Sequence, residues 1–246
     1  MKQKTNEKIS TKRTNQLQLL LARINIDPNK FVLQKTDLGF KIINEALTHT
    51  SANCSYNHER LEFLGDAVLR LAATKFIDYN FPRMTVGDRS ALRSILVSDD
   101  WLTKVGKNIK IEKVLIIGPK AEKDFAALST LQAEATEALI GAIYECLEDL
   151  SQIIIWLSPY WQEETFQVMK DPYRHNSKSA LQEWSQGKGL NLPKYAVQEV
   201  SQEHGDPKRF FCRVKIEDKV IGEGWGSSRK NAEKEAAISA LKSLKI

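Results

Sequence analysis

Apolar residues recur at helical spacing through most of the first 157 residues, and strand-like alternation is scarce there. The stretch 15–26 is amphipathic. The stretch 88–109 carries apolar residues at the same spacing and starts after Asp88, a residue type that favours helix starts. The pattern predicts an all-α domain over residues 16–158.

The pattern changes after a segment, residues 159–175, that contains Pro159 and Pro172 and is interpreted as a helix end followed by a linker. Residues 176–246 then predict the order α-β-β-β-α, which is a small α+β domain. In that order, the elements cover residues 177–189, 194–202, 208–218, 219–228 and 229–244.

One predicted helix, residues 58–71, carries acids within an otherwise apolar run. At about 100° per residue, Glu59, Glu62 and Asp66 fall within an arc of about 60°. A helix that is apolar on most sides is usually buried, and buried carboxylates are costly without a partner. An ion pair between Asp66 and Arg70 would satisfy one acid. A solvated acidic stripe and a metal site both remain open.

A second apolar helix, residues 131–147, carries Glu134 and Glu137 at i,i+3 spacing. Packed together, the two helices would bring four or five carboxylates into one cleft. Such hard oxygen ligands suit Mg²⁺ or Mn²⁺. No histidine has the Glu-x-x-His spacing of a di-iron bundle, and we expect none of the four histidines near these acids. Zinc and di-iron sites are therefore disfavoured.

Composition adds limits rather than a function. Residues 1–15 are predicted to be a flexible basic tail, with no apolar segment typical of a secretory signal or membrane anchor. The three cysteines have no metal-binding spacing, which fits a reducing cytoplasm. The formal net charge is +5, and most of the excess lies in residues 176–246, which favours a polyanionic partner.

Several stretches together resemble a known family. In chain order, "ALTHTS", "HERLEFLGDAVL", "SALRSILV" and "EATEALIGAIYE" resemble blocks of ribonuclease III, the double-stranded-RNA endonuclease. The stretches "ALQEW", "LPKYAV" and "GSSRKNAEKEAA" resemble a double-stranded-RNA-binding domain. The resemblance covers nearly all of the chain after residue 15.

The resemblance implies a Mg²⁺-dependent endonuclease, with Mn²⁺ as a possible substitute, that leaves 5′-phosphate and 3′-hydroxyl ends in precursor rRNA and mRNA. It also implies a cytoplasmic homodimer with neither a membrane segment nor an organic cofactor. The metal ligands that it implies are Glu62, Asp66, Glu134 and Glu137. Asp66 and Glu137 are also implied as catalytic acids, with Glu59 assisting at the edge, and Phe63 as a residue that inserts into the partner subunit.

For the second domain, the resemblance implies contact with A-form RNA over roughly 16 base pairs. Minor-groove contacts are expected from Lys178, Gln182 and His204. Phosphate contacts are expected from Arg229, Lys230 and Lys234, although a solvated helix face explains Lys234 equally well.

Two departures from the family pattern bear on activity. Glu134 stands where the family usually has Asp, and Thr50 stands where it has Arg. Both leave room for an alternative, a double-stranded-RNA-binding protein whose nuclease is catalytically weakened. Against it, every expected metal-site position carries a carboxylate.

Overall fold

A computed structural model of the protein describes residues 9–31, 38–119, 127–170, 173–203 and 206–244. The chain folds as two compact units, Met1–Thr165 and Phe166–Ile246. The first is helical. The second combines a three-stranded sheet with two helices.

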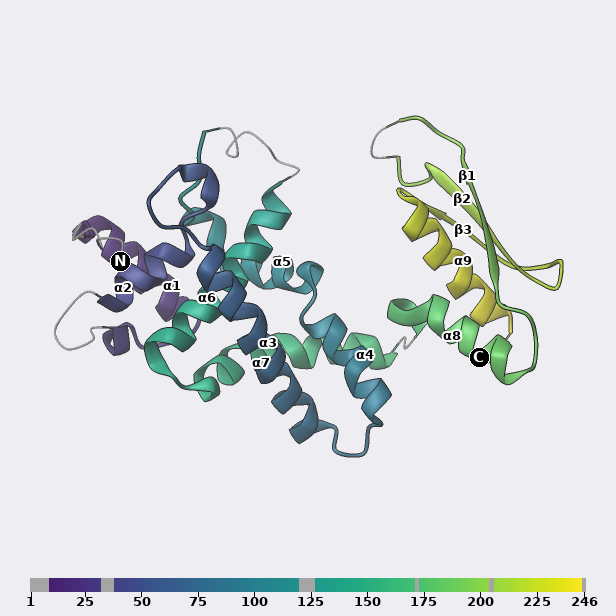
Figure 1. Ribbon diagram of the computed structural model, residues 1–246, viewed down its shortest axis with the longest axis horizontal. Coiled ribbons are helices and arrows are strands. Elements are labelled where there is room, and N and C mark those ends of the chain that lie inside the picture. The colour runs from purple at the N-terminus through teal and green to yellow at the C-terminus, as the bar shows by residue number, and fades with distance from the viewer. Residues whose placement is uncertain (1–8, 32–37, 120–126, 171–172, 204–205, 245–246) are drawn as a thin grey trace. The chain divides into compact units, whose positions relative to one another are not determined.

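Helices make up nearly all of the regular structure that is described in the first unit, as predicted (Figure 1). The α-helices are α1 (Thr11–Arg23), α2 (Leu38–Ala46), α3 (Glu59–Asn80), α4 (Val86–Leu96), α5 (Asp99–Asn108), α6 (Leu128–Leu147) and α7 (Leu150–Lys170). The described residues of this unit also form the 3₁₀ turns η1 (Pro28–Phe31), η2 (Thr50–Ala52) and η3 (Ile111–Lys113).

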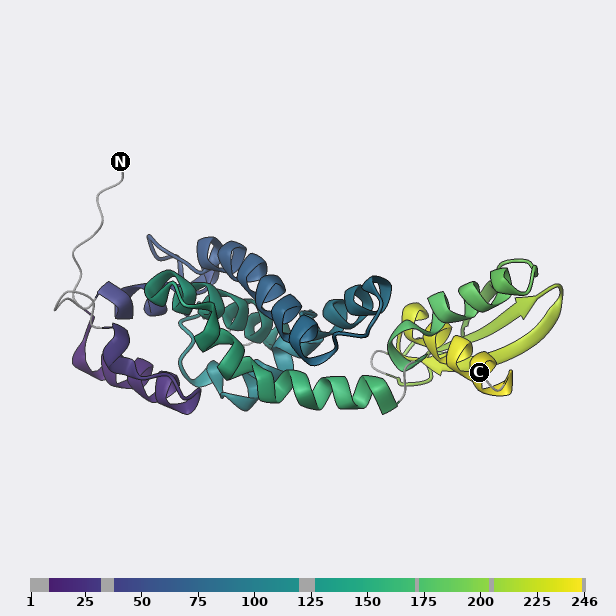
Figure 2. The same ribbon diagram turned by 90° about the horizontal axis from the view of Figure 1, so that it is seen from below.

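The close crossing of α3 and α6 organises this unit (Figure 1 and Figure 2). A Cβ atom on Gly65 would lie 2.0 Å from the backbone oxygen of Glu137, and one on Gly141 would lie 2.1 Å from that of Leu61. Only glycine permits backbones to approach so closely. The two acid-bearing helices are therefore in direct backbone contact.

A cluster of aromatic side chains fixes α7 to the rest of the unit. Trp161 is fully buried, its ring centroid lies 5.8 Å from that of Trp101, and its indole N–H donates to the Leu96 carbonyl at 3.1 Å. Its ring centroid also lies 5.2 Å from that of Phe76. Rings of this size supply much apolar burial, and the buried indole N–H has a partner. One side chain thus joins α3, α5 and α7.

The helices differ from prediction at their ends. Helix α1 begins at Thr11, capped by the Ser10 side chain, although the flexible tail was expected to extend to residue 15. The stretch 88–109 contains two helices, because the Ser98 side chain caps a new start. The first of them begins at Val86 after the cap Thr85, so that Asp88 lies in its first turn.

Helix α7 continues through Pro159 to Lys170, whereas residues 159–175 were interpreted as a helix end and linker. Proline removes one helical hydrogen bond, to the carbonyl four residues earlier. That carbonyl belongs to Ile155, whose side chain is 63% exposed, so the lost bond lies on the face toward water. The buried residues Trp156 and Trp161, on either side of the proline, keep the helix packed.

The second unit has the predicted order: α8 (Tyr173–Gly187), β1 (Lys194–Glu199), β2 (Phe210–Ile216), β3 (Lys219–Gly226) and α9 (Arg229–Ser243). The sheet is antiparallel in the order β1-β2-β3. Leu181 of α8, Val214 of β2 and Ala236 of α9 share one core, so both helices cover the same face of the sheet.

The α3–α6 crossing generates a testable prediction. Gly65→Ala should lower the free energy of unfolding by about 3 kcal/mol, because the new methyl group overlaps the Glu137 backbone. Gly87→Ala is the matched control, since its Cβ would meet only Thr85 Oγ1 at 3.8 Å. It should be neutral or slightly stabilising in its helix. Urea denaturation of both variants measures the difference, and equal midpoints would contradict this account.

Candidate active site

An open cleft of about 610 Å³ lies where α3 and α6 cross. All six residues expected at the nuclease site line it: Glu59, Glu62, Phe63, Asp66, Glu134 and Glu137. Sequence reasoning did not place the other three lining residues there: His49, Thr50 and His58.

The helix crossing brings the acids together. Glu62 and Asp66 lie one turn apart on α3, on either side of the contact that Gly65 makes with the Glu137 backbone. Glu134 lies one turn before Glu137 on α6. Each helix thus contributes acids at i,i+3 or i,i+4 spacing, on the side that faces the other helix.

Burial, followed by the neighbouring charges, raises the pKa of two carboxyl groups in the cleft. Partial burial, followed by the nearby charges of Asp66 and Glu62, raises the pKa of Glu137 to about 7. Burial also raises the pKa of Glu62, although the neighbouring His58 partly offsets this rise. Asp99, in the first turn of α5, adds to the negative field at both groups. The acids therefore repel one another in the metal-free protein.

The ion pair between Asp66 and Arg70, which the sequence suggested, is present. Arg70 Nε lies 2.7 Å from Asp66 Oδ1. It satisfies one acid and leaves the others without a positively charged lysine or arginine partner among the residues that the structure describes. The helix is not buried on most sides as its composition suggested, since Phe63 is 85% exposed and Leu71 is 50% exposed.

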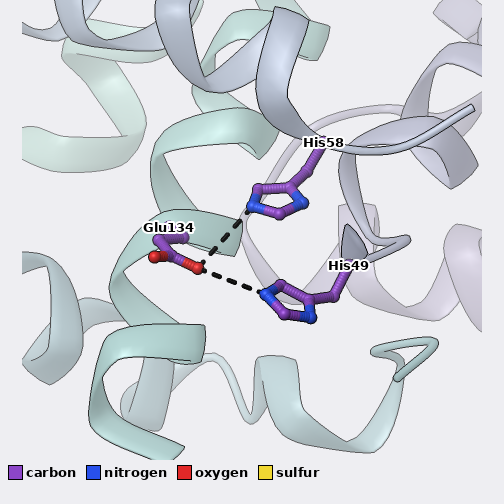
Figure 3. Close-up of side chains that lie close together, drawn as sticks. All are labelled: His49, His58 and Glu134. Atoms are coloured by element: carbon purple, nitrogen blue, oxygen red, sulfur yellow. Dashed lines mark ion pairs between the residues drawn. The ribbon is translucent and has the colours of Figure 1, made fainter. Parts of the chain in front are cut away.

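The expectation that no histidine lies near these acids was wrong. Figure 3 shows His49 and His58 facing Glu134, with Nε2 atoms 3.7 Å and 3.6 Å from its Oε2. His58 Nε2 also lies 3.2 Å from Glu62 Oε2. One signal was available, because His58 immediately precedes Glu59 and stands four residues before Glu62. The position of His49 could not be read from the sequence.

Backbone hydrogen bonds place the two histidines side by side. The His58 N–H donates to the Thr48 carbonyl at 2.9 Å, and the His49 N–H donates to the Ile116 carbonyl at 2.9 Å. The two rings stack with centroids 5.0 Å apart. Burial, followed by the neighbouring His58, lowers the pKa of His49, which favours its neutral form.

The carboxylate set fits a hard divalent cation. Glu62, Asp66, Glu134 and Glu137 offer only oxygen donors, and burial together with the charges of Asp66 and Glu62 raises the pKa of Glu137 despite the nearby Arg70. A divalent ion would supply compensating positive charge, and Mg²⁺ and Mn²⁺ prefer such ligands. The donor chemistry thus agrees with the sequence-based expectation.

In the second unit, the described residues among those expected to contact RNA lie on α8 and α9. Gln182 on α8 and Arg229 and Lys230 at the start of α9 are exposed, and Lys234 is partly buried. Lys178 is exposed but pairs with Glu233 at 2.5 Å, so RNA would have to compete for its ammonium group. His204 lies outside the described residues.

Comparison with known families divides the chain as the fold does. Residues 40–154 match the family model described as Ribonuclease-III-like. Residues 177–244 match the model described as Double-stranded RNA binding motif. Within the residues that the structure describes, no helix is long and apolar enough to span a membrane. The class is therefore a helical nuclease domain joined to a double-stranded-RNA-binding domain.

Individual relatives identify the family. "Ribonuclease 3" of Prochlorococcus marinus is 56% identical over 238 residues, which cover 96% of each chain. "Ribonuclease 3 2" of Synechocystis sp. is 38% identical over 228 residues, 93% of this chain and 91% of that one. The solved nuclease domain of ribonuclease III from Campylobacter jejuni matches with a TM-score of 0.50 and 28% identity, over 61% of this chain and 99% of that one. The chain belongs to the ribonuclease III family.

The raised pKa of Glu137 predicts how stability depends on pH. The pKa rises from 4.5 to about 7 on folding, so ionisation opposes folding increasingly as the pH rises through that range. In EDTA at about pH 8, Glu137→Gln should therefore be more stable than the parent, by about 1 kcal/mol after allowance for the group's partial exposure. Near pH 4 both side chains are neutral and this difference should vanish.

Thermal denaturation at the two pH values measures this effect. Glu163→Gln, which changes an exposed acid on α7, is the matched control and should show no such pH-dependent gain. A Glu137→Gln variant that is no more stable than the parent at the higher pH would show that the acids of the cleft do not repel as described.

Proposed function

We propose that this protein cleaves double-stranded RNA by phosphodiester hydrolysis that depends on Mg²⁺, with Mn²⁺ as a possible substitute. The observation that carries the proposal is the convergence of Glu62, Asp66, Glu134 and Glu137 from two helices on one open cleft. Four carboxylates in one place are unfavourable alone and become useful when a divalent cation binds.

In this proposal the four carboxylates hold the cofactor, and Asp66 and Glu137 are also the catalytic acids. The bound ion would supply Lewis-acid activation for attack at phosphorus and for stabilising the leaving oxygen. The chain's own part is to fix the acids, with Arg70 orienting Asp66 through their 2.7 Å contact. Glu59 is exposed in the first turn of α3, where it lines the cleft and assists at the site's edge.

The proposed assembly is a homodimer. Phe63 is 85% exposed, and Ala67 and Leu71 follow it along the same side of α3 at i+4 and i+8. An apolar stripe that is exposed in the single chain favours burial against a partner. The Campylobacter jejuni domain is described as having a region involved in dimer formation. Two symmetry-related sites would each cut one strand.

The second unit would hold the substrate by its shape. A double-stranded-RNA-binding domain contacts minor grooves and phosphates rather than reading bases. Lys178 and Gln182 on α8 are the proposed minor-groove contacts, together with His204. Arg229, Lys230 and Lys234 at the start of α9 are the proposed phosphate contacts. Precursor rRNA and mRNA in the cytoplasm are the proposed substrates, and the products carry 5′-phosphate and 3′-hydroxyl ends.

The metal requirement is tested with a labelled RNA hairpin on a denaturing gel. Cleavage should require Mg²⁺ or Mn²⁺ and stop with EDTA. Glu137→Ala should abolish cleavage, while gel-shift binding stays measurable because the RNA-binding domain is a separate unit. Glu163→Ala, on the exposed face of α7, is the matched control and should cut normally. RNA that is bound but never cut by the parent would favour the weakened RNA-binding protein.

The phosphate contacts are tested at Lys230. Lys230→Ala should weaken binding by a similar factor for hairpins of different sequence and reduce the slope of log affinity against log salt by about one unit. Lys242→Ala is the matched control, because that lysine lies about 18 Å further along the same helix. If the two variants bind alike, Lys230 belongs to a solvated helix face.

A further inference from the structure

We propose that His49 and His58 are positioning residues that hold the Glu134 carboxylate in the cleft by directing Nε2–H groups at its Oε2 atom. The inference rests on the proposed role of Glu134 as a metal ligand. It assigns the histidines a role toward that ligand rather than toward the metal.

The geometry joins three separate segments at one oxygen atom. His49 caps η2, His58 precedes α3, and Glu134 lies on α6. Both Nε2 atoms approach the same carboxylate oxygen, at 3.7 Å and 3.6 Å (Figure 3). These separations are longer than a good hydrogen bond, so they represent electrostatic contacts that a small movement of Glu134 would shorten.

The same three side chains could be read as a metal site, because their ligand atoms all lie within 4.8 Å of one another. The tautomer of His49 argues against that reading. The backbone N–H of Ser51 donates to His49 Nδ1 at 3.1 Å, and Ser51 Oγ lies 2.8 Å from the same nitrogen. Since Ser51 Oγ already accepts from the Gly118 N–H at 2.9 Å, its own hydroxyl proton is free to point at Nδ1.

His49 Nδ1 is thus an acceptor, and the proton of the neutral ring lies on Nε2. A protonated ring nitrogen cannot bind a metal, but it can donate to a carboxylate. The side chain of His49 is 22% exposed, so its contact with Glu134 is only partly screened by water. The hydrogen bonds of Ser51 therefore make His49 Nε2 a donor, and its neighbouring acceptors are the Thr50 hydroxyl at 3.4 Å and Glu134 Oε2 at 3.7 Å.

His58 occupies a different position, between two acids. Its side chain is 5% exposed, and its Nε2 lies 3.2 Å from Glu62 Oε2 as well as 3.6 Å from Glu134 Oε2. Its Nδ1 is buried without a hydrogen-bond partner in the part of the chain that the structure describes. A proton on Nε2 faces both carboxylates and offsets their mutual repulsion.

The contacts depend on the length of the Glu134 side chain. Removing one methylene would draw the carboxylate back by about 1.5 Å, one carbon–carbon bond. From 3.6 Å and 3.7 Å, that retreat would end the contact with both rings. The histidine pair and the glutamate at position 134 should therefore act as one unit, and their substitutions should not be additive.

The test measures Mg²⁺ affinity by isothermal titration calorimetry. His49→Ala should weaken binding about three- to tenfold, the loss expected for one ordinary hydrogen bond, because the 3.7 Å contact is longer than a strong bond to a charged group. His49→Gln should restore part of the affinity, because its amide nitrogen can reach a similar position. In a Glu134→Asp background, which should itself bind Mg²⁺ less well, His49→Ala should cause little further loss. His175→Ala, a histidine of the second unit, is the control.

A second measurement separates a donor from a ligand. Pulsed electron paramagnetic resonance of bound Mn²⁺ detects a directly coordinated nitrogen. We expect none in the parent, and a directly coordinated nitrogen would overturn the inference in favour of a histidine ligand. His49 carries the main test because it is partly exposed, and thermal melting will show that its variants remain folded.

The outcomes separate this inference from the proposed function. If His49→Ala leaves the Mg²⁺ affinity unchanged while Glu137→Ala abolishes cleavage, the positioning role of the histidines is refuted and the proposed active site stands. Equal losses from His49→Ala in the parent and in the Glu134→Asp background would also end it, because the histidine would then act independently of Glu134. Normal cleavage by Glu137→Ala would instead overturn the proposed active site.

Discussion

The close contact between α3 and α6 is the constraint on which the site depends. Gly65 and Gly141 let each backbone reach the other helix, and this proximity places the acids of α3 opposite those of α6. A wider crossing would bury side chains between the helices and separate the carboxylates. The fold thus uses tight packing at one point to hold together groups that repel each other.

Three features around the cleft reduce the repulsion between its carboxylates. Arg70 pairs with Asp66, the histidines face Glu62 and Glu134, and protonation of Glu137 removes one charge when no metal is bound. Glu62, Asp66, Glu134 and Glu137 thus each have a neighbouring group or a protonation that reduces the repulsion when no metal is bound.

Helical periodicity predicted the two acid-bearing helices and the acids on their faces, strand-like alternation predicted the α-β-β-β-α order, and the family resemblance supplied the expected metal ligands. None of these signals could predict the stacking of His49 on His58, because that depends on a hydrogen bond from His58 to Thr48 across a loop. The sequence indicated a helix end and a linker within residues 159–175, and it could not show that α7 runs through Pro159 to Lys170, because the burial of Trp161 that keeps the helix continuous depends on the tertiary structure. Local signals indicate elements and, through caps such as Ser98, some of their ends, whereas packing decides the continuity of a helix such as α7.

The sequence positions of Gly65 and Gly141 also determine the order in which parts of the helical unit can pack during synthesis. Gly65 emerges from the ribosome well before Gly141, so α3 must wait, with Leu61 uncovered, until α6 has been translated. Trp161 arrives later still and closes the aromatic cluster. Because chains fold domain by domain from the N-terminus, the helical unit can be complete before the last strand of the second unit exists. During translation, the acidic cleft can therefore form before the double-stranded-RNA-binding domain has folded.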